Sequence, residues 1–311
     1  DPSRLVIFDI YENNAYELQT ELRSIYKDRI DVKILIGSIQ DKQLIDDVFR
    51  VWKPGVVFHA AAHKHVPLME DNLAEAVKNN VFGTYNVALC ADKYKVKKFV
   101  LISSDKAVNP TNVMGATKRI AELIIQALDK QSSTKYSAVR FGNVLGSNGS
   151  VIPLFKKQIA QGGPVTVTHP DIKRYFMTIS EAAQLVIQSG AIAEGGEIFV
   201  LNMGEPVKIV DLARDLIRLS GLEPDIDIKI EFIGLRPGEK MFEELYLEDE
   251  KVMATKHTKI FVGKPLSVYY SQMVSYINQL EENINRPEEL SRKVYKIVTL
   301  YTSEEIAASL S

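Results

Sequence analysis

Short apolar runs alternate with longer amphipathic stretches through the first half of the chain. The apolar runs are too short for buried helices and suit strands covered on both faces of a parallel sheet. They occupy residues 4–8, 32–36, 56–58, 98–103, 137–141 and 197–201, and helices are predicted over 12–25, 41–52, 71–94 and from 113 onward. Strands separated by helices of this length predict an α/β fold built on a doubly wound parallel sheet.

The alternation of apolar runs and amphipathic stretches becomes less regular after Gly142. Residues 146–171 are rich in Gly, Ser, Pro and Thr and predict a loop-rich region that would contact a substrate. We therefore expect a first unit over 1–145 and a second, intertwined unit over 146–311, with about 175–203 returning to the first sheet. Near the end, 270–284 and 287–308 are typical of amphipathic helices with a solvated or subunit-contacting face.

Composition narrows the class of protein. The chain has 311 residues, 46% hydrophobic and 25% charged, with a net charge of −2, so it has no electrostatic footprint for nucleic acid. Cys90 is the only cysteine, which excludes an intrachain disulfide and favours a reducing compartment. The histidines at 59, 63 and 65 lack the carboxylate spacing that would support a metal site. The absence of a long apolar run and of a signal peptide predicts a soluble chain.

Polar side chains follow the 98–103 strand at its carboxyl end, where ligands bind in open α/β sheets. Ser104, Asp105 and Lys106 would therefore face a substrate, although a plain turn is the alternative because Asn and Pro follow. In the helix beyond, Met114 and Lys118 share a face at i and i+4. Taken alone, such a pair is more often packing beside a solvated charge.

Asp9 ends the first apolar run. In a dinucleotide-binding fold an acidic residue there binds the ribose hydroxyls, which favours NAD over NADP. The signal is weak by itself, since Asp is common after any strand. The glycine-rich turn that should lie about 20 residues earlier would precede Asp1, so a first strand and that turn are missing from the sequence.

Six motifs together resemble a known family. They lie at 59–62, 80–84, 103–118, 139–147, 174–178 and 234–240. They resemble the extended short-chain dehydrogenase/reductases, and more narrowly the membrane-associated UDP-N-acetylglucosamine 4,6-dehydratases of bacterial polysaccharide and glycan synthesis. The resemblance runs from residue 1 to about 265. Met114 stands where most members have the tyrosine of a Tyr-x-x-x-Lys pair, and methionine there is typical of the branch that retains the C5 configuration.

The resemblance implies a Rossmann-like fold and a hydro-lyase reaction. NAD would take hydride from C4 of the UDP-sugar, water would leave across C5 and C6, and hydride would return to C6, giving a UDP-4-keto-6-deoxy-N-acetylhexosamine. It also implies a homo-oligomer working at the cytoplasmic face of the inner membrane, with membrane contact through upstream segments only.

The same resemblance assigns roles to residues. Asp105 would protonate the departing C6 hydroxyl and Lys106 would remove the C5 proton. This requires burial to outweigh the ion pair between them, because the ion pair favours both charged forms. Met114 cannot move a proton, so Ser104 or a water held by Lys118 is the candidate for the C4 hydroxyl proton.

Further residues are expected to bind the cofactor or the substrate. The cofactor set is Asp9, Ser38, Ile39, Ala60, Ala61, Ala62, Asn80 and Lys118, and the substrate set is Asn143, Arg174, Arg236 and Glu239. Arginine suits a diphosphate because its planar fork donates two parallel hydrogen bonds. The plainer alternatives are turns, packing and solvated charges, and for Glu239 a helix cap. Two other functions stay open: a nucleotide-sugar 4-epimerase, and a non-catalytic nucleotide-sugar or dinucleotide-binding module.

Overall fold

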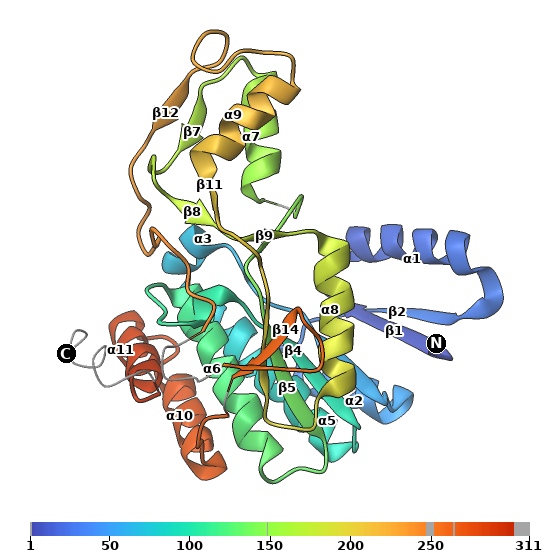
Figure 1. Ribbon diagram of the computed structural model, residues 1–311. Helices are drawn as coiled ribbons and strands as arrows, with labels where there is room; N and C mark the ends of the chain where they lie inside the picture. Colours follow the sequence, from blue (N-terminus) through green and yellow to red (C-terminus); the bar gives the residue numbers. More distant parts are fainter. Residues whose placement is uncertain (1, 148, 247–251, 264, 302–311) are drawn as a thin grey trace.

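The computed structural model describes residues 2–147, 149–246, 252–263 and 265–301. A central sheet lies between two layers of helices, and a smaller lobe stands beyond one end of its strands (Figure 1). The prediction of an α/β fold with a mainly parallel sheet is confirmed.

The central sheet has six strands in the order β13-β14-β10-β5-β4-β3. From β3 to β10 the strands run parallel, and the sheet continues through antiparallel pairs to β14 and β13. The strand bounds are β3 Val56–His59, β4 Lys98–Ile102, β5 Lys135–Arg140, β10 Ile198–Leu201, β13 Met253–Ala254 and β14 Ile260–Gly263. β4 and β10 are almost wholly buried, as expected for apolar strands with helices on both faces.

Two N-terminal strands form a sheet of their own. β1 (Arg4–Asp9) and β2 (Asp31–Ile36) pair in parallel over six residues, but neither pairs with β3 among the described residues. A doubly wound sheet of order 3-2-1-4-5-6 would have one more parallel strand between β1 and β3. Val56 and Phe58 of β3 are about half exposed, so the edge of β3 is left open.

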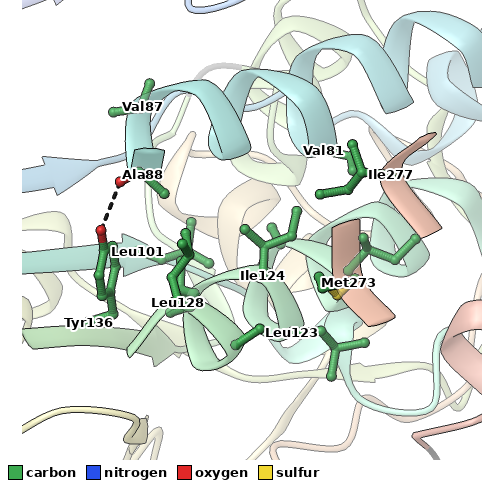
Figure 2. Close-up of a cluster of buried hydrophobic side chains, with 14 of the residues drawn as sticks. Val81, Val87, Ala88, Leu101, Leu123, Ile124, Leu128, Tyr136, Met273 and Ile277 are labelled. Carbon is green, nitrogen blue, oxygen red and sulfur yellow. Dashed lines mark hydrogen bonds between the residues drawn. The ribbon is translucent and has the colours of Figure 1, made fainter. Parts of the chain in front are cut away.

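One face of the central sheet carries the main core. Apolar side chains of α5 and α6 meet those of β4, β5 and α10 there, and the Tyr136 hydroxyl donates a hydrogen bond to the Ala88 carbonyl (2.8 Å; Figure 2). Helix α8 covers the opposite face. The helices of this body are α1 Glu12–Tyr26, α2 Lys42–Trp52, α3 Val66–Glu70, α4 Leu73–Ala76, α5 Thr84–Lys93, α6 Val113–Asp129, α8 Ile179–Ile192, α10 Tyr270–Glu282 and α11 Pro287–Thr299.

The lobe has a separate core. Helices α7 (Val151–Ala160) and α9 (Ile209–Leu219) pack on the short strands β7 and β12 around Phe155 and Ile217. The lobe and its connections contain β6 Asn143–Val144, β7 Val165–Val167, β8 Lys173–Arg174, β9 Phe176–Met177, β11 Val207–Lys208 and β12 Ile230–Phe232. The loop-rich prediction for 146–171 is therefore wrong in part, because buried Phe155 and Ile159 recur at helical spacing within it.

Other boundaries also differ from the sequence prediction. In place of the single helix expected over 71–94, the structure has three consecutive helical segments: α4, the π-helix η2 (Val77–Gly83) and α5. Short 3₁₀ turns, η1 (Lys27–Arg29) and η3 (Asp105–Ala107), were not predicted. The last helix ends at Thr299, and the remainder of the expected 287–308 helix lies beyond the described residues from 302 onward.

Candidate active site

The strand β4 delivers its polar residues to the edge of the sheet that faces the lobe. After Ile102 the chain passes Ser103 and Ser104, turns through η3, and reaches α6 at Val113. We call residues 103–112, which include the candidate catalytic residues Ser104, Asp105 and Lys106, the catalytic loop. The Asn112 side chain caps α6 by accepting a hydrogen bond from the Gly115 amide (2.8 Å), which fixes where the loop ends and the helix begins.

Gly115 allows the loop to lie against the helix. A Cβ at Gly115 would stand 2.1 Å from the carbonyl oxygen of Lys106 and 3.1 Å from Pro110. Only a residue without a side chain permits this approach. The position of Lys106 is therefore set by the first turn of α6.

Asp105 and Lys106 form a direct contact at the centre of the site. Lys106 Nζ lies 3.0 Å from Oδ1 of Asp105, and the same oxygen accepts hydrogen bonds from Ser104 Oγ (2.8 Å) and the Lys106 amide (2.9 Å). Asp105 is fully buried, and within the described part of the chain its Oδ2 has no hydrogen-bond partner. A buried carboxyl oxygen left without a partner is costly, so Oδ2 is suited to hold a proton or meet a polar group of a ligand.

The charge on Lys106 differs from the sequence prediction. Burial lowers the pKa of Lys106, but the carboxylates of Asp105 and Glu243 raise it by more, so the net direction is upward. The expectation that burial outweighs the ion pair is therefore wrong for this state of the protein. Lys106 is an ammonium here and must lose a proton before it can act as a base.

A segment of the lobe is latched onto the catalytic loop. The Gly238 carbonyl accepts hydrogen bonds from the Thr111 hydroxyl (3.1 Å) and the Asn112 amide group (3.2 Å), and Lys240 Nζ donates to the Val108 carbonyl (3.0 Å). This latch brings Glu243 to 4.0 Å from Lys106 Nζ. Glu243 is buried and carries the third ionisable group of the centre.

Arg174 holds the same segment from the lobe side. Its guanidinium donates to the carbonyls of Lys240 (2.8 Å) and Met241 (3.2 Å) and lies 3.5 Å from Glu239. In the described structure Arg174 is thus a clamp on residues 239–241, and a diphosphate would have to share or replace these contacts. Arg236, by contrast, is exposed.

Glu239 closes a turn and does not cap a helix. Its carboxylate accepts hydrogen bonds from the Arg236 amide (3.1 Å) and the Thr168 hydroxyl (3.3 Å), and no helix begins there. The helix-cap alternative is therefore wrong.

Asn143 lies beside the pair. Its Oδ1, on β6, is 3.5 Å from Lys106 Nζ, so Asn143 belongs to the same centre.

The side chains of Met114 and Lys118, both on α6, have different surroundings. Met114 is buried against Met69, Ala76 and Val113, in apolar contact. Lys118 donates from Nζ to the Ile102 carbonyl (2.6 Å), and burial lowers its pKa to about 8, against the opposing influence of Glu122. Lys118 therefore ties the end of β4 to the helix and is readily deprotonated, whereas Met114 is a packing residue.

The residues expected near a cofactor lie at the ends of β1, β2 and β3. Asp9 is exposed and accepts a hydrogen bond from the Tyr11 amide (2.8 Å). Ser38 accepts one from the Gln40 amide (3.2 Å), while Ile39 is buried against Gly83. Asp9 and Ser38 are therefore placed at the sheet edge, and Ile39 can offer only its backbone.

The loop after β3 is pinned from the π-helix. Asn80 accepts from the His63 amide (2.7 Å) and donates to the His63 carbonyl and the Thr117 hydroxyl (both 3.0 Å). Ala60 and Ala61 are exposed and Ala62 is partly buried, so their backbone is open to a ligand. Asn80 itself is buried and positions this loop from beneath.

A buried ionic network supports the catalytic loop. Glu122 of α6 accepts hydrogen bonds from Ser103 Oγ (2.6 Å), Arg140 (2.7 Å from Nε and from Nη2) and Arg119 (3.0 Å). Burial would raise the pKa of Glu122, but the two arginines hold it at about 2. Sequence reasoning missed this network and Glu243, because charged residues at helical spacing predict a solvated face.

Among the described residues no group of three or more His, Cys, Asp or Glu side chains could hold a metal ion.

The fold defines a class of α/β proteins built on a doubly wound parallel sheet, with a polar loop at the carboxyl ends of its strands. The chain belongs to the polysaccharide biosynthesis protein family, whose model matches residues 1–265. It is 58% identical over 265 residues to the capsular polysaccharide biosynthesis protein CapD of Staphylococcus aureus, covering 85% of this chain and 44% of that protein. It is 32% identical over 268 residues to an inverting UDP-N-acetylglucosamine 4,6-dehydratase of Campylobacter jejuni, covering 85% and 75%. The chain spans about half the length of the curated relatives that it resembles at above 50% identity.

Solved structures share the architecture. Pen from Bacillus thuringiensis is 40% identical, with a TM-score of 0.77 over 87% of this chain and 82% of that one. A dTDP-glucose 4,6-dehydratase from Streptomyces venezuelae with bound NAD is 18% identical, with a TM-score of 0.70 over 92% of this chain and 90% of that one. At that identity the second likeness concerns the fold alone. No helix of the described chain is long and apolar enough to cross a membrane.

Proposed function

We propose that this chain is the catalytic part of an NAD-dependent 4,6-dehydratase acting on UDP-N-acetylglucosamine, in the synthesis of a bacterial polysaccharide or glycan. The observation that carries the proposal is the Asp105–Lys106 pair at the carboxyl end of β4, with Asp105 fully buried and Lys106 partly buried. Loss of water across C5 and C6 needs an acid for the leaving hydroxyl and a base for the C5 proton. A 4-epimerase needs neither.

The residues present fit both chemical roles. Asp105 is fully buried and its Oδ2 has no hydrogen-bond partner in the described structure, which supports a role in proton exchange with a ligand. Lys106 stands on a short 3₁₀ turn, held between Asp105, Asn143 and Glu243, and would act as a base once its ammonium group has lost a proton. We assign protonation of the C6 hydroxyl to Asp105 and removal of the C5 proton to Lys106.

NAD suits the edge formed by β1, β2 and β3. The exposed carboxylate of Asp9 would accept hydrogen bonds from ribose hydroxyls, Ser38 would lie beside the adenine, and the open backbone of Ala60 and Ala61 would face the cofactor. Lys118, with its pKa near 8, would bind close to the nicotinamide ribose. Bound NAD would supply a hydride acceptor and donor for the sugar.

The substrate would lie between the catalytic loop and the latch. Arg236 is exposed and free to meet a diphosphate by a bidentate contact, with Asn143, Arg174 and Glu239 nearby in the lobe. The chain matches about half the length of its relatives above 50% identity, which supports the proposal that it acts as the catalytic part of a longer enzyme. By resemblance, we propose that this enzyme works as an oligomer at the cytoplasmic face of the inner membrane.

The direct test is to incubate the chain with NAD⁺ and UDP-N-acetylglucosamine and to weigh the sugar nucleotide by mass spectrometry. Loss of one water supports the dehydratase. An unchanged mass with an altered sugar configuration indicates the epimerase, and binding of UDP without turnover indicates a binding module.

The Ser104→Ala variant tests the first proton transfer. Ser104 Oγ is the hydroxyl nearest to the reacting pair by its bond to Asp105 Oδ1, and we assign to it the C4 hydroxyl proton. The variant should then form NADH more slowly than the wild type in a single turnover. Formation of NADH at the wild-type rate would transfer this role to a water held by Lys118.

A further inference from the structure

Glu243 lies at the proton-transfer centre but comes from a distant part of the chain. Its Oε1 is 4.0 Å from Lys106 Nζ and 3.8 Å from Arg174 Nε, and its side chain is 5% exposed. The ionisable groups that face it in the described structure are Lys106, Asp105, Arg174 and Lys240. No role in the proposed reaction has yet been given to this carboxyl.

The elimination step creates a need that Asp105 and Lys106 cannot easily meet alone. Asp105 must carry a proton while Lys106 lacks one, yet their 3.0 Å contact favours the opposite arrangement, carboxylate and ammonium. The second carboxyl, that of Glu243, adds a further site for a proton. If two titratable protons are shared among Asp105, Lys106 and Glu243, both carboxyls can be protonated while Lys106 is a neutral amine.

We propose that Glu243 accepts the ammonium proton of Lys106, so that a neutral amine faces C5 while Asp105 keeps a proton for the leaving hydroxyl. The inference rests on the proposed function. In this transfer an Nζ–H bond breaks and an Oε–H bond forms, and the net charge of the cluster does not change. Glu243 would act on the reaction through Lys106, so it is a positioning residue for proton transfer.

The surroundings of Glu243 support this role. Burial raises the pKa of the Glu243 carboxyl and Asp105 adds to the effect, while Lys106, Arg174 and Lys240 oppose it. A poorly hydrated site favours a neutral amine and acid over separated charges. The 4.0 Å separation exceeds a hydrogen bond, so transfer needs an approach of about 1 Å, which the long lysine side chain can make.

The Glu243→Gln variant removes the proton acceptor and keeps the shape. We expect kcat for water loss to fall about 100-fold with KM for the UDP-sugar within about threefold of wild type. The wild-type cluster keeps its second proton only below the raised carboxyl pKa, so wild-type kcat falls as pH rises through that value. The variant should lack this decline, and Glu243→Asp should recover part of the rate.

The matched control is Glu282→Gln, the same change at a residue outside the site. Glu282 is exposed at the end of α10, so its variant should keep the wild-type kcat and pH profile. The inference is overturned if Glu243→Gln keeps both as well. It is also overturned if kcat and KM change together with the pH profile intact, since that pattern indicates loss of structure only.

An infrared titration of the chain alone separates this inference from the proposed function. A carboxylic-acid C=O stretch should persist at neutral pH in wild type and Glu282→Gln and be missing from Glu243→Gln. If wild type eliminates no water, the proposed function fails, and the infrared result still decides whether Asp105 and Glu243 share a proton at neutral pH. A spectrum unchanged by Glu243→Gln contradicts the shared proton.

Discussion

Substitution of Gly115 by alanine should disable the site without removing any reacting group. The new Cβ would stand 2.1 Å from the Lys106 carbonyl oxygen, and ordinary contact begins at 3.4 Å. The helix backbone and the loop must therefore separate by about 1.3 Å. Because the obstructing atom belongs to the backbone, no side-chain rotation relieves the overlap.

The displacement would fall on Lys106 itself. A misplacement of about 1 Å can cost about 100-fold in rate, since reacting groups must meet at near-contact geometry. Alanine favours a helix interior over glycine by about 1 kcal/mol, which offsets part of the strain. We therefore expect Gly115→Ala to lower kcat about 100-fold while the free energy of unfolding falls by no more than about 3 kcal/mol.

The assay is steady-state water loss, together with urea unfolding of the same preparation. Gly55→Ala is the control, because a Cβ at Gly55 meets nothing within 4 Å. The reasoning would be refuted if Gly115→Ala kept kcat within about threefold of wild type in a fully folded chain.

Two further substitutions test the supporting structure. The pKa of Glu122 is lowered from 4.5 to about 2, so it stabilises the fold above about pH 4.5 and this contribution, on the order of 3 kcal/mol, is lost as the pH falls toward 2. Glu122→Gln should lower the free energy of unfolding by about 3–5 kcal/mol at neutral pH, because Arg119 and Arg140 lose a buried counter-charge. In urea titrations at several pH values, the free energy of unfolding of the variant should fall less steeply toward acid pH than that of the wild type. An unchanged acid slope would contradict this. Met114→Leu should keep kcat within about threefold and cost less than about 1.5 kcal/mol, since the thioether only packs; a large loss of kcat in a folded Met114→Leu enzyme would place the sulfur in the chemistry.

The sequence predicted the sheet better than the site. The strand 98–102 is apolar after Lys98, and because such strands are buried on both faces, their apolar runs can be recognised from the sequence alone. The position of Asp105 and Lys106 follows from the strand that precedes them. The lobe helix α7 was not predicted because glycines, serines and prolines surround it in the sequence, although its buried residues recur at helical spacing.

The site residues that were missed come from tertiary contacts. Glu243 lies 137 positions after Lys106 in the sequence, and the latch through Gly238 and Lys240 brings them together. Nothing local distinguishes Glu243 from its exposed neighbour Glu244. Likewise Arg174 has the sequence context of a ligand-binding arginine, yet in the structure it holds backbone carbonyls.

The central claim is that hydride leaves C4 and returns to C6 within one active site. The most direct test uses UDP-N-acetylglucosamine carrying deuterium at C4, with NAD⁺ in ordinary water. The account predicts a product that has lost one water and carries the deuterium at C6 of the same sugar. Deuterium found at C4 of an epimerised sugar, or transferred to the free cofactor, would contradict it.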